Sequence, residues 1–116
     1  MSNLVDKEAL LDRVDGDLEF LEETVELLES DGRTLVEQLK GASAAGDQDG
    51  LVQKAHILKG MVSNFCADRV QQEAEEIELA ARKGELDGIP PKVKNFIELF
   101  ECLCRETRAM LSGEGG

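Results

Sequence analysis

The sequence is short of the residues that most binding and catalytic sites require. Its 116 residues include no tryptophan, no tyrosine and only one histidine. Without a row of aromatic side chains, the chain lacks the stacking platform that binds the bases of single-stranded nucleic acid. A lone histidine likewise excludes a multi-histidine metal centre. Any chemistry that the protein performs must therefore depend on very few residues.

Basic residues are also scarce, because 13 lysines and arginines face 25 acidic residues and leave a net charge of −12. Such a surface repels nucleic acid and anionic lipid, so we expect neither as a partner. No run is long and apolar enough for a membrane span. The segment from Met1 to Asp15 mixes acids with single leucines and valines, unlike a secretion signal. We therefore expect a cytoplasmic protein.

The three cysteines, Cys66, Cys102 and Cys104, are an odd number without Cys-x-x-Cys spacing. This pattern favours neither a disulfide framework nor a zinc site. We predict reduced, partly buried thiols, no bound metal and no cofactor. A reactive redox thiol at Cys66 is an alternative, although a packed small side chain is the commoner role.

Length and composition indicate a single domain over residues 1–116. Hydrophobic residues make up 41% of the chain and charged residues 33%, a balance that supports a stable core at this size. Apolar residues recur at steps of three and four, which is typical of amphipathic helices, and no stretch alternates as a strand does. The sequence therefore predicts an all-α fold.

The first half of the chain contains one short and two long predicted helices. The short helix follows the N-cap Asp6, from Lys7 to Val14, and stops at an Asp-Gly-Asp turn. The first long helix, with a candidate kink at Gly32, buries a stripe formed by Leu18, Leu21, Val25, Leu28, Gly32, Leu35 and Leu39. The second follows a glycine-containing junction and buries Leu51, Ala55, Leu58, Val62 and Phe65.

Two further long helices complete the predicted fold. The third begins at a capping box formed by Asp68 and Gln71, ends before Gly84 and buries Val70, Ala74, Ile77 and Ala81. Pro90 and Pro91 suit the first turn of the last helix. Its buried face is Val93, Phe96, Ile97, Phe100, Leu103, Cys104 and Leu111. Short links favour an antiparallel up-down four-helix bundle, with the short extra N-terminal helix as a lid.

His56 lies on the far side of its helix from the core. At about 100° per residue, the apolar residues of that helix cluster within about 80°, while His56 lies roughly 140° from Leu51. It shares this outer side with Gln53, Gly60 and Ser63. A lone histidine is usually a hydrogen-bonded core residue, but this periodicity predicts an exposed one. An exposed histidine without a task is the remaining alternative.

Two neighbours favour a functional histidine. Gly60 lies one turn beyond His56, where a side chain would cover part of the imidazole. A mid-helix glycine costs about 0.5–1 kcal/mol relative to alanine, so the helix accepts a cost to leave room there. Lys59 is three residues on, and its ammonium can reach the same patch and offset the charge of a phosphoryl group on the ring.

The run from Ala55 to Ala67, AHILKGMVSNFCA, resembles the signature of histidine-containing phosphotransfer (HPt) domains, in which Leu-Lys-Gly follows the phosphorylated histidine. The resemblance spans most of the chain, from the start of the first long helix to the end of the glutamate-rich helix. Met61 and Val62 depart from the small residues usual in the family. Cys66 stands where a glycine is common, and only this departure affects the backbone.

The resemblance implies that His56 accepts a phosphoryl group, that Lys59 supports the phosphate and that Gly60 clears space. It makes Glu78 a candidate contact of the ring, which would fix the tautomer and leave the other nitrogen free to attack phosphorus. A solvated surface glutamate is an equal alternative. Ser63 is either a site neighbour or an ordinary surface serine. The glutamate run of that helix is interpreted as a solvated face rather than a metal site, namely Glu73, Glu75, Glu76 and Glu78.

The implied function is that of a phosphoryl carrier in a two-component phosphorelay. The implied partners are a response-regulator receiver domain, whose aspartate exchanges the phosphate, and a sensor or hybrid histidine kinase. The chain has no glycine-rich nucleotide loop and no evident magnesium site, so Mg²⁺ is expected on the receiver and independent enzymatic activity is not expected. Ile57 and Met61 are candidate docking residues.

Two alternatives remain open at this stage. The first alternative is the phosphoacceptor domain of a chemotaxis-type histidine kinase, and the absence of a kinase segment argues mildly against it. A non-phosphorylated helical adaptor is the alternative from a different class. The combination of His56, Lys59 and Gly60 argues against an adaptor, which has no need of a glycine beside an exposed histidine.

Overall fold

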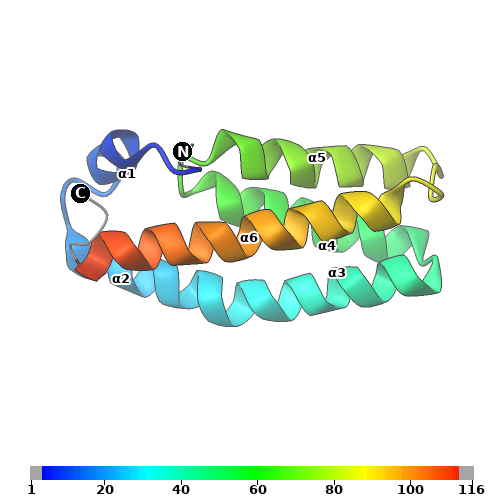
Figure 1. The fold of residues 1–116 in the computed structure, drawn as a ribbon, viewed down its shortest axis with the longest axis horizontal. Coiled ribbons are helices and arrows are strands. Elements are labelled where there is room, and N and C mark those ends of the chain that lie inside the picture. Colours follow the sequence, from blue (N-terminus) through cyan, green and yellow to red (C-terminus); the bar gives the residue numbers. More distant parts are fainter. Residues whose placement is uncertain (1–3, 113–116) are drawn as a thin grey trace.

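The computed structural model describes residues 4–112, and these residues form helices packed side by side (Figure 1). The short helix α1 (Lys7–Arg13) precedes a long rod made of α2 (Leu18–Leu27), the π-helical turn η1 (Leu28–Gly32) and α3 (Arg33–Ala45). Three helices follow, α4 (Gln48–Ser63), α5 (Asp68–Arg82) and α6 (Ile89–Ser112). The predicted all-α helical bundle is confirmed.

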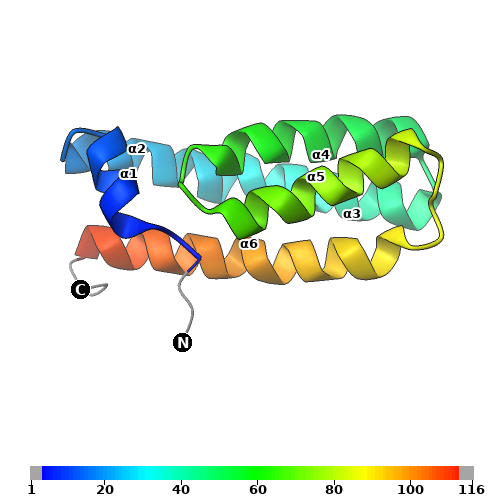
Figure 2. The ribbon, with the colours of Figure 1, turned by 90° about the horizontal axis from the view of Figure 1, so that it is seen from above.

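The chain runs back and forth along the bundle, so that each long helix lies beside the next (Figures 1 and 2). The most extensive contact is between α4 and α5, and α6 packs against α2, α3 and α5. Helix α1 lies across one end of the bundle, next to the start of α2 (Figure 2). No helix among residues 4–112 is long and apolar enough to cross a membrane.

Aspartate caps and left-handed glycines set most of the helix boundaries. Asp6, Asp17 and Asp47 each accept a hydrogen bond from the backbone N–H three residues on, at 3.1, 3.0 and 3.0 Å. Each carboxylate satisfies an N–H that has no partner within the first turn. Gly46 and Gly84 follow the ends of α3 and α5 with positive φ of 65° and 75°. The caps predicted at Asp6 and Gly84 are therefore confirmed.

The link between α4 and α5 differs from the prediction. Ala67, whose side chain makes no capping hydrogen bond, is the N-cap of α5, and Asp68 lies inside the first turn, so the predicted capping box is wrong. Cys66 has a φ of 53°, the left-handed conformation that favours glycine. Its carbonyl accepts a hydrogen bond from the N–H of Asp6 at 3.0 Å. The cysteine thus keeps the glycine-type backbone, at a cost of about 1 kcal/mol.

The first long helix is not one regular α-helix. A π turn holds more residues than an α turn, so beyond η1 the buried stripe continues at Val36, whereas the predicted Leu35 is half-buried. Leu18, at the start of the predicted stripe, is 51% exposed. Gly32 is buried, and a Cβ built there would lie 2.7 Å from Cζ of Phe100. The glycine therefore permits close packing of η1 on α6.

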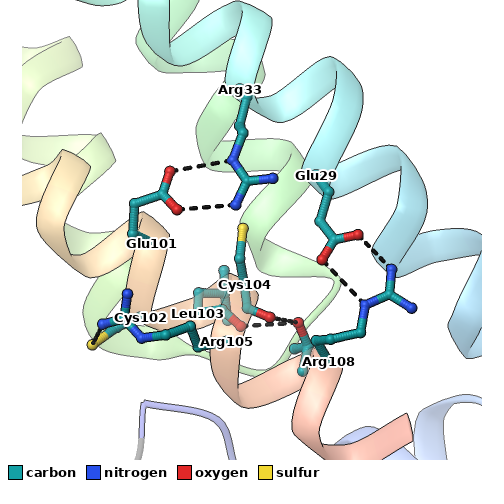
Figure 3. Close-up of polar contacts among 9 residues, drawn as sticks. Glu29, Arg33, Glu101, Cys102, Leu103, Cys104, Arg105 and Arg108 are labelled. Atoms are coloured by element: carbon teal, nitrogen blue, oxygen red, sulfur yellow. Dashed lines mark hydrogen bonds and ion pairs between the residues drawn. The ribbon is translucent and has the colours of Figure 1, made fainter. Parts of the chain in front are cut away.

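Two ion pairs join this rod to α6 (Figure 3). Arg33 donates two hydrogen bonds to Glu101, at 3.3 and 3.0 Å, and Arg108 pairs with Glu29. Cys104 lies between the two pairs (Figure 3) and is buried. Burial raises the pKa of the Cys104 thiol to about 11, so the thiol stays protonated at neutral pH. The two pairs therefore link the rod to α6, and Cys104 between them is not a reactive thiol.

Candidate functional site

His56 lies on the outer face of α4, as the helical periodicity predicts. Its side chain is 61% exposed. The opposite face of α4 carries Leu51, Ala55 and Leu58, all of which are buried. Because a helix turns by about 100° per residue, burying these three positions leaves His56 on the solvent side. The ring is therefore open to a partner.

The space beside His56 on the C-terminal side is empty. A Cβ built at Gly60 would have no heavy atom within 4 Å outside the local helix backbone. The clearance expected at Gly60 is therefore present, whereas its use by a partner is still a prediction. The Ser63 hydroxyl donates a hydrogen bond to the carbonyl of Gly60 at 2.7 Å, within its own helix, and its place in the site stays a prediction.

Glu78 reaches the imidazole from α5. Its Oε2 lies 3.1 Å from Nδ1 of His56. The Glu78 side chain is only 5% exposed, so it is not the solvated surface residue of the alternative interpretation. The packing of α5 on α4 brings this carboxylate under the exposed ring, and the candidate contact between Glu78 and His56 is present.

Two cations share the Glu78 carboxylate with the imidazole. Nζ of Lys59 lies 2.9 Å from Oε1 and forms an ion pair with it. Arg82 donates to Oε2 from Nε at 3.1 Å and from Nη2 at 2.7 Å. The Lys59 side chain is 25% exposed and pairs with Glu78, and its support of a phosphoryl group on the ring stays a prediction. The positive charge beside His56 thus comes with a buried negative partner.

This environment fixes the charge of Glu78 and selects the ring nitrogen that carries the proton in the neutral imidazole. Burial by itself raises the pKa of Glu78, but hydrogen bonds and charge from Lys59 and Arg82, with the contact to His56, outweigh it and lower the pKa from 4.5 to about 2. A carboxylate only accepts hydrogen bonds, so Nδ1 of His56 must donate. In the neutral ring, Nε2 then keeps a free lone pair.

An open groove between α4 and α5 adjoins the histidine. His56, Ile57 and Arg82 line it, together with Gln48, Asp49, Val52 and Gln53. Ile57 is 43% exposed, whereas Met61, the second predicted docking residue, is half-buried. Sequence reasoning missed Arg82, although a glutamate four residues before an arginine on a helix is a favourable pair and was visible in the sequence.

The other acids of α5 play different roles. Glu75 and Glu76 are exposed, as expected of a solvated face. Glu73 is half-buried and accepts a hydrogen bond from Asn95 of α6 at 2.9 Å. Within the described residues 4–112, no group of three or more His, Cys, Asp or Glu side chains is placed to hold a metal ion.

Comparison with known families identifies the class of protein. A family model of the Hpt domain matches residues 19–112, which include nearly all of α2 and the whole of α3 to α6. The chain therefore belongs to the Hpt domain family, and the resemblance seen in its sequence is confirmed. Searches of curated proteins and of solved structures found no significant match. Helix α1 precedes the matched residues.

Proposed function

We propose that this protein is a phosphoryl carrier that accepts a phosphoryl group on Nε2 of His56 and passes it on. The observation that carries this proposal is the pairing of Nδ1 with the buried Glu78 at 3.1 Å, on a ring whose side chain is 61% exposed. One nitrogen is held by the protein, and the other is available to a partner. Membership of the Hpt family supports phosphotransfer in two-component signalling.

The transfer step needs no proton to enter or leave the ring. The Nε2 lone pair attacks phosphorus of an aspartyl phosphate, the N–P bond forms, and the P–O bond breaks to release the aspartate as a carboxylate. The ring, which keeps its proton on Nδ1, gains positive charge as the bond forms. Glu78 lies where that charge develops, 3.1 Å from Nδ1, so its carboxylate stabilises the phosphorylated ring. The reverse step returns the phosphoryl group.

The proposed partner is a response-regulator receiver domain that supplies the aspartate and the Mg²⁺ for charge stabilisation. Phosphoryl transfer is accelerated mainly by positioning and by cations around the transferred group. In this chain, Lys59 and Arg82 lie beside the ring but are engaged by Glu78. The protein therefore acts as a carrier whose catalysis is completed by the partner, and a sensor or hybrid histidine kinase is the proposed source of the phosphate.

A transfer assay tests this proposal directly. Purified protein is mixed with receiver domains phosphorylated in advance, and movement of the label onto the chain is followed over time. A His56→Gln variant, which keeps a side-chain amide able to face Glu78, is expected to remain unlabelled while unfolding at the same temperature as wild type. Equal labelling of both proteins would overturn the assignment of His56.

A further inference from the structure

Arg82 makes the shortest polar contact with the carboxylate that orients His56. Its Nη2 lies 2.7 Å and its Nε 3.1 Å from Oε2 of Glu78. Oε2 is also the oxygen that faces Nδ1 of His56, at 3.1 Å. One carboxylate oxygen therefore receives the arginine and the imidazole together, and the position of this oxygen determines where the ring points.

The two oxygens of Glu78 are held by cations from two different helices. Nζ of Lys59, on α4, lies 2.9 Å from Oε1. Arg82, on α5, donates two hydrogen bonds to Oε2. The last torsion of a glutamate has broad, shallow minima, so a carboxylate with a cation on one oxygen only is free to turn. With a separate cation on each oxygen, turning the carboxylate breaks both pairs at once.

We infer that Arg82 is a positioning residue for His56, acting through Glu78 rather than on the phosphoryl group. This inference rests on the proposed phosphotransfer function for its kinetic consequence, but not for its structural one. Arg82 aligns Oε2 with Nδ1, and this alignment keeps the proton on Nδ1 and the lone pair on Nε2. Without Arg82, the carboxylate turns toward Lys59, and the Nε2–H tautomer becomes populated.

The arginine differs from an ordinary surface charge at the end of α5. Its side chain is 54% exposed, but its partner is only 5% exposed, so solvent screens this pair less than a pair of two exposed side chains. Lys83 follows Arg82 in the chain and is exposed, and its side chain has no partner among residues 4–112. Lys83→Met therefore removes the same charge from the same helix end and serves as the matched control.

The first test measures the tautomer without any phosphate. The chain has one histidine, so an untagged protein with ¹⁵N-labelled histidine gives long-range imidazole correlations from His56 alone. In wild type, we expect Nδ1–H to dominate. Arg82→Met is expected to shift the tautomer ratio at least about threefold toward Nε2–H, the size of a lost hydrogen-bond preference. Arg82→Lys should bring the tautomer ratio part of the way back to the wild-type value. Lys83→Met should give the wild-type ratio.

The second test measures reactivity with phosphoramidate, a small phosphoryl donor that needs no docking surface. Arg82→Met is expected to slow labelling of His56 about tenfold, because the ring loses its fixed orientation in addition to part of its Nδ1–H population. In a Glu78→Gln background, the same substitution should have little further effect, because Arg82 acts through Glu78. Circular dichroism and thermal unfolding confirm that each variant is folded.

The outcomes separate this inference from the proposed function. A wild-type tautomer ratio in Arg82→Met overturns the inference, and so does a full tenfold loss that persists in the Glu78→Gln background, since Arg82 would then act on the phosphoryl group itself. A shifted tautomer in Arg82→Met, in a protein whose wild type accepts no phosphate from any donor, supports the positioning role and overturns the proposed function instead.

Discussion

Two faces of the bundle contain the same residue types in different structural roles. On the α4–α5 face, Gly60 has open space beside it, and the Glu78 carboxylate is 5% exposed with three donors around it. On the face where η1 and α3 meet α6, the ring of Phe100 occupies the space beside Gly32. Glu101 on this face is 40% exposed and pairs with Arg33. Each face has a helical glycine, a carboxylate and arginine.

The difference shows that burial, more than residue type, distinguishes a candidate functional site from a contact that only packs two helices together. A glycine against a packed ring allows two helices to approach, whereas a glycine beside nothing keeps a surface clear. A carboxylate shared by several donors out of water has a fixed charge and direction, whereas an exposed pair is screened and contributes little. The following predictions test this contrast, beginning with the largest expected effect.

Acid should weaken the α4–α5 face most. Because the folded-state pKa of Glu78, about 2, lies below the ordinary 4.5, its stabilising effect is present above pH 4.5 and lost as the pH falls toward 2. The shift corresponds to about 3 kcal/mol. Urea unfolding of wild type and Glu78→Gln from pH 7 to pH 2 should give a difference that shrinks over this window. The stability difference between wild type and Glu101→Gln should change less over the same pH range. A larger change for Glu101→Gln than for Glu78→Gln would contradict the contrast between the two faces.

Filling the packed glycine should be the next largest effect. In Gly32→Ala, the new Cβ lies 2.7 Å from Cζ of the buried Phe100, and overpacking of this kind costs about 1–3 kcal/mol. The gain in helix propensity, about 0.5–1 kcal/mol, offsets only part. We expect chemical denaturation to show a net loss of stability. In a Phe100→Leu background, which makes room, the same substitution should cost less, and an unchanged cost would contradict the steric explanation.

Filling the open glycine should have the opposite sign. Gly60→Ala meets nothing within 4 Å, so it should stabilise the protein by about 0.5–1 kcal/mol. Its methyl group projects beside His56, where it should obstruct a docked receiver and slow transfer about tenfold. Gly41→Ala, in α3 and also without neighbours, is the matched control and should stabilise without slowing transfer. Unchanged transfer in Gly60→Ala would remove the space-clearing role.

The smallest effect is expected at the exposed ion pair. Arg33 and Glu101 are 49% and 40% exposed, and pairs of this kind typically couple by about 0.2–1 kcal/mol. A double-mutant cycle of Arg33→Gln and Glu101→Gln should give a coupling in this range that falls in high salt. The labelling of His56 should be unaffected in all members of the cycle. A coupling above about 2 kcal/mol would mean that this exposed pair is as strong as a pair to a buried carboxylate such as Glu78, and would contradict the comparison.

Much of the fold was predictable because the signals are local. The aspartate cap at Asp6 and the left-handed Gly84 depend on a few neighbouring residues, and both have the predicted roles. The capping box at Asp68 failed because Cys66 adopts a left-handed backbone and places Ala67 at the cap position. The one-residue shift of the stripe from Leu35 to Val36 followed from a π turn, and no periodicity count includes such a turn.

The sequence by itself determined the exposure of His56 and the small size of the residue one turn beyond it, since helical spacing places both without reference to any other helix. Only the tertiary structure decided that Glu78 lies buried beneath the ring and that Lys59 and Arg82 converge on it. The register of α5 against α4 is set by the packing of two apolar stripes. The contact between α4 and α5 therefore pairs Nδ1 of the exposed histidine with Glu78 and leaves Nε2 free.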